Sequence, residues 1–186
     1  MKNLKYYLSL LYPPHIWIPI IFYLLSTNKK IIKSDMYRWC QATGVYINSP
    51  IQQLSYLLLF DKPFRNLFYR RLGQIGKYIN IILSGEKTLF ITSAPIGHGL
   101  FIRHGYATFI NSKYIGKNCT IHQCTTIGDS GKGIPTIGDN VTIGAGCIIL
   151  GPITIGNNVT IAAGSIVVND VPSNSTVIGH KAIIKK

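Results

Sequence analysis

The sequence predicts a mainly β chain, in which a parallel β-helix built from hexapeptide repeats follows an α-helical N-terminal region. Two observations lead to this fold class. Aliphatic residues recur at intervals of six in the second half of the chain, whereas the first half is rich in aromatic and long aliphatic residues. The amino-acid composition changes near residues 88–93. We therefore expect a basic, aromatic-rich helical region over residues 1–92 and a β-helix domain with a short C-terminal tail over residues 93–186.

The repeat gives the strongest structural signal. Its aliphatic positions are Ile115, Ile121, Ile127, Ile137, Ile143, Ile149, Ile155, Ile161 and Val167. An amphipathic helix needs apolar residues after three and four positions, so a period of six fits a short strand and a turn instead. Three such strands form one coil of a triangular prism, with branched residues inside and small residues at the tight corners. Coils bury their faces by stacking on neighbours, and about five coils fit between residues 94 and 179.

Two interruptions of the repeat indicate where functional residues are to be sought. Ile127 and Ile137 are ten residues apart rather than six, so four extra residues within segment 128–133 are expected to leave the prism as a loop. Ile102 and Ile115 are thirteen apart, one more than two repeats. Loops on a rigid scaffold tend to carry function.

The N-terminal half is expected to form helices over residues 2–12, 34–43, 51–60 and 64–83. A break is expected at residues 61–63, because a proline tends to end a helix before it. The most apolar stretch, residues 16–25, contains Pro19 and is shorter than the roughly 18 residues that a membrane-spanning helix needs. No small-residue cleavage site of a secretory signal follows it, so a cytoplasmic location is expected.

The charge is concentrated in the same half. The chain has 19 Lys and Arg against 6 Asp and Glu, a net charge of +13, and residues 1–92 hold 12 of these cations and 3 of the acids. Basic residues mixed with Trp and Tyr suit the surface of an anionic membrane. Two interpretations stay open: a peripheral contact with the inner face of the membrane, or a solvated cap on a trimer. No nucleic-acid-binding module is visible, so a nucleic acid partner is not expected.

The composition also excludes several classes of protein. With 47% hydrophobic residues, the chain is too apolar for a disordered protein. Its four cysteines, at positions 40, 119, 124 and 147, have neither the pattern of a disulfide-rich domain nor the CxxC spacing of a zinc site. We therefore expect reduced thiols and no metal.

Segments 94–111, 115–133 and 135–179 resemble the left-handed β-helix acyltransferases, on the serine acetyltransferase-like branch that includes capsule and lipopolysaccharide O-acetyltransferases. Segment 64–70, FRNLFYR, resembles the N-terminal helices of that branch. The resemblance implies a left-handed β-helix, a homotrimer or a dimer of trimers, an active site in a groove between neighbouring prisms, and acetyl-CoA as co-substrate. It also implies a histidine general base, since a hydroxyl is a weak nucleophile at neutral pH.

The resemblance assigns His104 as the catalytic base. The alternative is a surface histidine at a coil corner. A coil of about 18 residues with a one-residue insertion is expected to stack Gln123 over His104 and His122 over Arg103. Arg103, His122 and Gln123 are therefore acceptor-binding candidates, and a solvent-facing His122 remains an equal alternative.

The same resemblance implies cofactor contacts at five positions. They are Asp129 and Lys132 in the loop, the backbone N–H groups of Ala145 and Ala163 on the next two coils, and Lys181 in the tail. Lysines meet CoA phosphates as point charges. For Lys181, a solvated terminus is an equal alternative.

The sequence also departs from the serine acetyltransferases. Their loop carries an Arg and a His that help to hold serine, and an Asp precedes the catalytic His; here segment 133–137 has neither, and residue 103 is Arg. The ammonium of a zwitterion needs a carboxylate, so the predicted acceptor is a saccharide hydroxyl in surface polysaccharide biosynthesis. A serine O-acetyltransferase of cysteine biosynthesis, a sugar N-acetyltransferase and a non-catalytic β-helix scaffold are the alternatives. What orients His104 stays open, with a backbone carbonyl or Asn111 as candidates.

Overall fold

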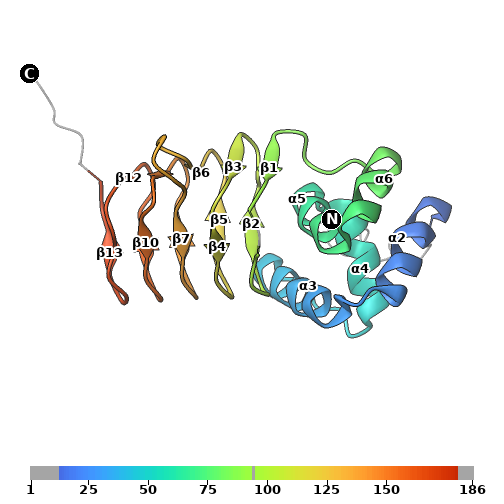
Figure 1. Ribbon diagram of the computed structural model, residues 1–186. Coiled ribbons are helices and arrows are strands. Elements are labelled where there is room, and N and C mark those ends of the chain that lie inside the picture. Colours follow the sequence, from blue (N-terminus) through green and yellow to red (C-terminus); the bar gives the residue numbers. More distant parts are fainter. Residues whose placement is uncertain (1–12, 94, 180–186) are drawn as a thin grey trace, which may run out of the picture.

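The computed structural model describes residues 13–93 and 95–179. A group of helices covers one end of a stack of β-coils, and the last strand, β13 (Thr176–Val177), lies at the other end (Figure 1). The predicted fold class, a β-helix of hexapeptide repeats after an α-helical region, is confirmed. The predicted division of the chain at residue 92 stays a prediction.

The helices of the described chain are α2 (Pro14–Leu25), α3 (Lys29–Thr43), α4 (Pro50–Phe60), α5 (Lys62–Leu72) and α6 (Gln74–Ile82). Proline stands in the first turn of α2, α4 and α5, where its missing N–H costs nothing. Asp61 caps α5 by accepting a 3.1 Å hydrogen bond from the backbone N–H of Phe64. Gly44 ends α3 in the left-handed conformation.

Three helix predictions need correction. The helix expected over 64–83 is two helices, because Gly73 adopts φ 65 and breaks it into α5 and α6. Helix α3 begins at Lys29 rather than at residue 34. Helix α2 occupies the apolar stretch for which no helix was predicted, with Pro19 inside it. The helix expected over 2–12 lies outside the described residues, and none of the described helices has the length and apolar character needed to cross a bilayer.

The strands form three parallel sheets, one for each face of the prism. Sheet I contains β1 (Leu89–Ile91), β3 (Thr108–Ile110), β6 (Thr126–Gly128), β9 (Ile148–Leu150) and β12 (Ile166–Val167). Sheet II contains β4 (Tyr114–Ile115), β7 (Thr136–Ile137) and β10 (Thr154–Ile155). Sheet III contains β2 (Phe101–Arg103), β5 (Thr120–His122), β8 (Thr142–Ile143), β11 (Thr160–Ile161) and β13 (Thr176–Val177). The aliphatic residues of the repeat are buried inside the prism, as predicted.

The corner between sheets II and III shows why the repeat needs its small and polar residues. Asn140 and Asn158 stand there with φ 56 and 57, a conformation that asparagine tolerates well. The amide of Asn140 donates a 3.0 Å hydrogen bond to Asn158 Oδ1 in the next coil. Gly116 approaches the next coil so closely that a Cβ would lie 2.3 Å from the carbonyl of Gly138.

A buried polar cluster joins the helices to the first coil. Arg71 on α5 forms a 2.8 Å salt bridge with Asp35 on α3, and its guanidinium also donates to the carbonyls of Ile96 and Gly97. The Asp35 carboxylate accepts a 2.6 Å hydrogen bond from Gly99 N. Burial raises the pKa of Asp35, and Arg71 opposes this effect. One continuous hydrophobic core runs through both regions. The helices therefore hold the first coil in a fixed place, together with the turn that follows β2.

Candidate functional site

His104 lies on an irregular turn between β2 and β3, at the corner where the chain passes from sheet III to sheet I. Arg103 pairs with His122 in the next coil, as predicted. Cys124 N then donates to the carbonyl of Tyr106, in the same way that Gly146 N donates to Gln123 one coil later. Gln123 therefore occupies, in its coil, the position that Tyr106 occupies in the coil before. The predicted stacking of Gln123 over His104 is wrong.

The error has a simple geometric origin. The thirteen residues from Ile102 to Ile115 were interpreted as two repeats plus one residue. The structure puts Ile110, the inward residue of β3, eight residues after Ile102 and five before Ile115. The corner before β3 therefore contains two extra residues, His104 and Gly105, and the next corner is one residue short.

The extra residues form a turn that displays the imidazole. Gly105 N donates a 2.9 Å hydrogen bond to the carbonyl of Arg103, across a central His104 with φ 65. Positive φ costs an L residue about 1–2 kcal/mol, and strained backbone of this kind concentrates at functional sites. His104 is exposed, and its ring stacks on Tyr106 with centroids 5.7 Å apart and planes 21° apart. The sequence analysis did not identify Tyr106. The thirteen residues from Ile102 to Ile115 were the signal that could have pointed to an irregular turn there.

Neither Asn111, which was proposed to orient His104, nor Glu86, the acidic residue nearest to it in the sequence before the turn, hydrogen-bonds its ring. Asn111 follows β3, on the far side of a strand that is about 10 Å long. The Glu86 carboxylate accepts hydrogen bonds from the backbone and hydroxyl of Thr88, and Thr88 Oγ1 accepts one from Ala107 N. Glu86 thus supports the chain that leaves the turn. Within the part of the chain that the structure describes, no group hydrogen-bonds the His104 imidazole, and the stacked Tyr106 ring is its side-chain contact.

The neighbouring coil contributes a histidine with a lowered pKa and an unsatisfied amide. Burial lowers the pKa of His122, and Coulombic repulsion from Arg103, and from His104 when it is protonated, lowers it further. Both effects favour the uncharged form of the His122 imidazole. Gln123 Oε1 is buried and accepts no hydrogen bond from any residue in the described ranges. A buried oxygen without a donor is costly, so the Gln123 side chain would gain a hydrogen bond by turning towards a ligand hydroxyl or N–H group.

Gln123, Ala145 and Ala163 occupy equivalent positions on three successive coils of the same corner. Gly146 N donates to Gln123 and Gly164 N donates to Ala145, which fixes this alignment. The backbone N–H groups of Ala145 and Ala163 themselves donate to no residue in segments 13–93 and 95–179. Successive coils are about 4.8 Å apart. The corner therefore offers evenly spaced free donors that lead away from the His104 turn.

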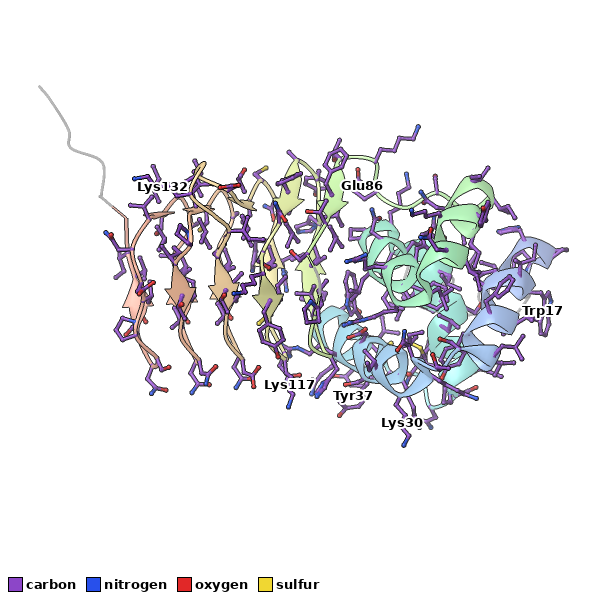
Figure 2. The ribbon with its side chains drawn as sticks, in the orientation of Figure 1. Trp17, Lys30, Tyr37, Glu86, Lys117 and Lys132 are labelled. Carbon is purple, nitrogen blue, oxygen red and sulfur yellow. The ribbon has the colours of Figure 1, made fainter. Side chains whose placement is uncertain are left out.

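The loop after β6 lies on the other side of sheet I. Asp129 Oδ1 accepts hydrogen bonds of 2.7 and 2.9 Å from the backbone N–H groups of Gly131 and Gly133, which closes the loop. Lys132 is exposed and lies on this loop at the upper edge of the prism (Figure 2). The structure thus separates Asp129 and Lys132 from the His104 corner by the width of sheet I. Lys181 lies outside the described residues.

The outer face of sheet I, between the corner and the loop, is mainly apolar, with one threonine in the middle of a row of exposed residues. One residue from each strand lines up across it, and we call these residues the sheet I stripe: Phe90, Phe109, Thr126, Ile148 and Ile166. All five are exposed, Ile166 by 67%. Contiguous exposed apolar residues on a folded protein mark an interaction surface. No group of three His, Cys, Asp or Glu residues suited to a metal is found in the described chain.

Comparisons with known proteins agree with this geometry. The family model "Bacterial transferase hexapeptide (six repeats)" matches residues 134–169. Serine acetyltransferase from Staphylococcus xylosus is 46% identical over 125 residues, which cover 61% of this chain and 58% of the relative. The putative colanic acid biosynthesis acetyltransferase WcaB from Escherichia coli K12 is 47% identical over 97 residues, which cover 50% of this chain and 60% of the relative.

Solved structures extend the similarity into the helical region. Neisseria gonorrhoeae serine acetyltransferase (CysE) in complex with serine matches with a TM-score of 0.66 and 28% identity, over 98% of this chain and 83% of that one. The chain spans 49% to 66% of the length of the first curated relatives that it matches.

Proposed function

Because the chain belongs to the left-handed β-helix acyltransferases of the hexapeptide-repeat family, on the serine acetyltransferase-like branch, we propose that it transfers an acetyl group from acetyl-CoA to a saccharide hydroxyl. The saccharide is a precursor of a surface polysaccharide, acylated in the cytoplasm at the inner face of the membrane. The observation that carries the proposal is the exposed His104 turn, next to the corner with free backbone donors.

In this mechanism His104 is the general base. The neutral imidazole takes the proton of the acceptor hydroxyl while the hydroxyl oxygen attacks the thioester carbonyl. The new C–O bond forms, the C–S bond breaks, and the protonated imidazole returns its proton to the CoA thiolate. Tyr106 holds the ring by stacking, and the positive φ of residue 104 displays the imidazole away from the prism.

The corner and the loop bind different parts of acetyl-CoA. The free N–H groups of Ala145 and Ala163 match the amide carbonyls of a pantetheine arm laid along the corner. The hydrogen bonds of Asp129 hold the loop that presents Lys132. There, and at Lys181 in the tail, a lysine supplies a point charge for the CoA phosphates.

The separation of these two elements favours a trimer. One chain places the corner and the loop on opposite sides of sheet I, so the site needs a second surface to close it. The sheet I stripe is an apolar surface in the right place for a neighbouring copy. We expect a homotrimer, or a dimer of trimers, in sedimentation equilibrium. A fully active monomer would contradict the shared site.

The charges around His104 favour a saccharide over free serine. Arg103 is exposed and forms no ion pair within the described chain, so the acceptor side of the turn is positive. The ammonium of serine needs an anion there, whereas sugar hydroxyls suit the unsatisfied Gln123 side chain and the uncharged form of His122, which its surroundings favour. Arg103, His122 and Gln123 are therefore proposed to bind the acceptor.

Serine is the second candidate acceptor, and the comparisons favour it directly. Several relatives are named serine acetyltransferase, and one matched structure holds serine. The deciding experiment measures CoA release from acetyl-CoA with L-serine, with amino sugars and with a panel of neutral and acidic saccharides. Turnover with saccharides and not with serine supports the proposal. Turnover with serine alone overturns the acceptor assignment, and N-acetylation of an amino sugar identifies the nitrogen-directed alternative.

A further inference from the structure

We propose that the helical end of the molecule docks on an anionic membrane surface, through the outer face of α2 and a lysine-lined hollow beside it. The inference goes beyond the acetyl transfer and does not depend on it. It also chooses between the two interpretations that the basic N-terminal half left open.

Helix α2 exposes an apolar face to solvent at the end of the molecule remote from β13 (Figures 1 and 2). The exposed residues are Trp17, Ile18, Ile21, Leu24 and Leu25. Their spacing of one, four, seven and eight positions puts them on one side of the helix. The opposite side is also apolar and is buried in the core, with Ile16 and Ile20 fully covered. A helix that faces water normally has a polar outer side, so this face is built for an apolar environment.

A hollow of about 730 Å³ adjoins this face, where α2, α3 and α4 meet. Leu24 belongs to both the face and the hollow, and Ile51 and Pro50 continue the apolar wall. Three exposed lysines, Lys29, Lys30 and Lys33, line its other side. Lys29 Nζ lies 5.7 Å from the Tyr23 ring centroid, which keeps this ammonium at the hollow. Ammonium groups beside an apolar wall suit a phosphate that carries an acyl chain.

The charge of this end is complementary to an anionic lipid surface. Asp35 is the only acidic residue among the first 60 of the sequence. It is buried in the salt bridge with Arg71, so it does not neutralise the lysines at the surface. A cluster of lysines next to apolar and aromatic side chains is the pattern of peripheral membrane-binding helices.

A second copy of the chain fits the same face less well. A twofold contact places the same surface of both copies together. Lys29, Lys30 and Lys33 of one copy would then face those of the other, and like charges across an interface disfavour association. The lipid surface supplies the opposite charge and the apolar layer at once.

The test uses the full chain with phosphatidylcholine vesicles, with and without phosphatidylglycerol, at low and high salt. Co-sedimentation is expected with the anionic vesicles at low salt and is expected to weaken as salt screens the lysines. The chain has two tryptophans, and Trp39 is fully buried. A blue shift of emission on binding therefore reports Trp17. Trp17→Phe is expected to keep binding and to lose the shift.

Matched variants separate the docking surface from general charge. Lys29→Gln, Lys30→Gln and Lys33→Gln together are expected to weaken binding about tenfold or more, because each lysine near an anionic surface contributes several-fold. Lys87→Gln, Lys113→Gln and Lys117→Gln remove the same charge from exposed positions on the β-helix side and are expected to change binding far less. Ile21→Ser with Leu25→Ser is expected to weaken binding more than Val168→Ser with Ile178→Ser, which are also exposed.

Three outcomes overturn the proposal: no binding to anionic vesicles at low salt, equal losses in the test and control sets, or no emission shift in the bound wild type. Self-association without vesicles that Ile21→Ser and Leu25→Ser abolish would assign the face to a second copy instead. His104→Ala is expected to bind vesicles like the wild type, so failure of docking and failure of the acetyltransferase assignment give different results.

Discussion

His104 stands on a turn whose positive φ costs free energy. Within the described chain, no hydrogen bond to the His104 ring offsets this cost. Its φ of 65 and its stacking on Tyr106 replace the carboxylate that often orients a basic histidine. The strain is sustained because the turn is held between β2 and β3, both of which pair with neighbouring strands.

Tyr106 is accordingly a positioning residue. Tyr106→Ala is expected to lower kcat about 10- to 100-fold, since small misplacements of a base have effects of that size. Tyr106→Phe keeps the stacked ring and is expected to restore most of kcat. Steady-state kinetics of the two variants check this. Equal activity of Tyr106→Ala and the wild type would show that stacking plays no part.

The charge of Arg103 also affects the protonation of a neighbouring residue, His122. Its pKa lies below the ordinary value, through burial first and then through Coulombic repulsion from Arg103, and from His104 when it is protonated. Arg103→Gln removes one of these charges, so the pKa of His122 is expected to rise towards its usual range. A titration followed by NMR of the histidine Cε1–H signals measures it, with Lys117→Gln as a remote control. An unchanged or lower pKa in Arg103→Gln would contradict the electrostatic account.

At the scale of elements, the coils stack because glycine permits close contact at the corners. Gly116→Ala puts a Cβ 2.3 Å from the Gly138 carbonyl, and is expected to lower the free energy of unfolding by about 1–3 kcal/mol. Gly128→Ala is the matched control, because its Cβ would meet only ordinary contacts at 3.9 Å. Urea unfolding of both variants measures the difference. Equal stability of the two would mean that the corner can relax.

The elements also show what sequence could predict. The β-helix was predictable because a six-residue period is a local pattern that reports the inward residues directly. The His104 turn was not, since the thirteen residues from Ile102 to Ile115 fix only the net insertion and not its division between two corners. Helix α2 was missed because it is apolar on both sides and contains Pro19, so it has no amphipathic period. The polar cluster of Asp35 and Arg71 joins residues far apart in the sequence, which periodicity cannot reveal.

For the whole molecule, the account assigns one task to each part. The helices hold the first coil and present the end that we propose to bind lipid. The β-helix presents the His104 turn, the corner donors and the sheet I stripe. The candidate base His104 and the backbone donors of Ala145 and Ala163 could be proposed from the sequence through its resemblance to the left-handed β-helix acyltransferases, whereas the repeat alone predicts only the scaffold. The resemblance also implies a site between neighbouring prisms, but the sequence could not tell which face of the prism is left apolar for a neighbouring copy.

The central claim is that acetyl transfer takes place at the His104 turn. The most direct measurement is acceptor-dependent CoA release by the full chain, comparing the wild type with His104→Ala and with His15→Ala, an exposed histidine on α2. We predict saccharide-dependent release by the wild type and by His15→Ala, and a loss of about 10²- to 10⁴-fold in His104→Ala with its fold intact by circular dichroism. Wild-type rates in a folded His104→Ala variant would contradict the account.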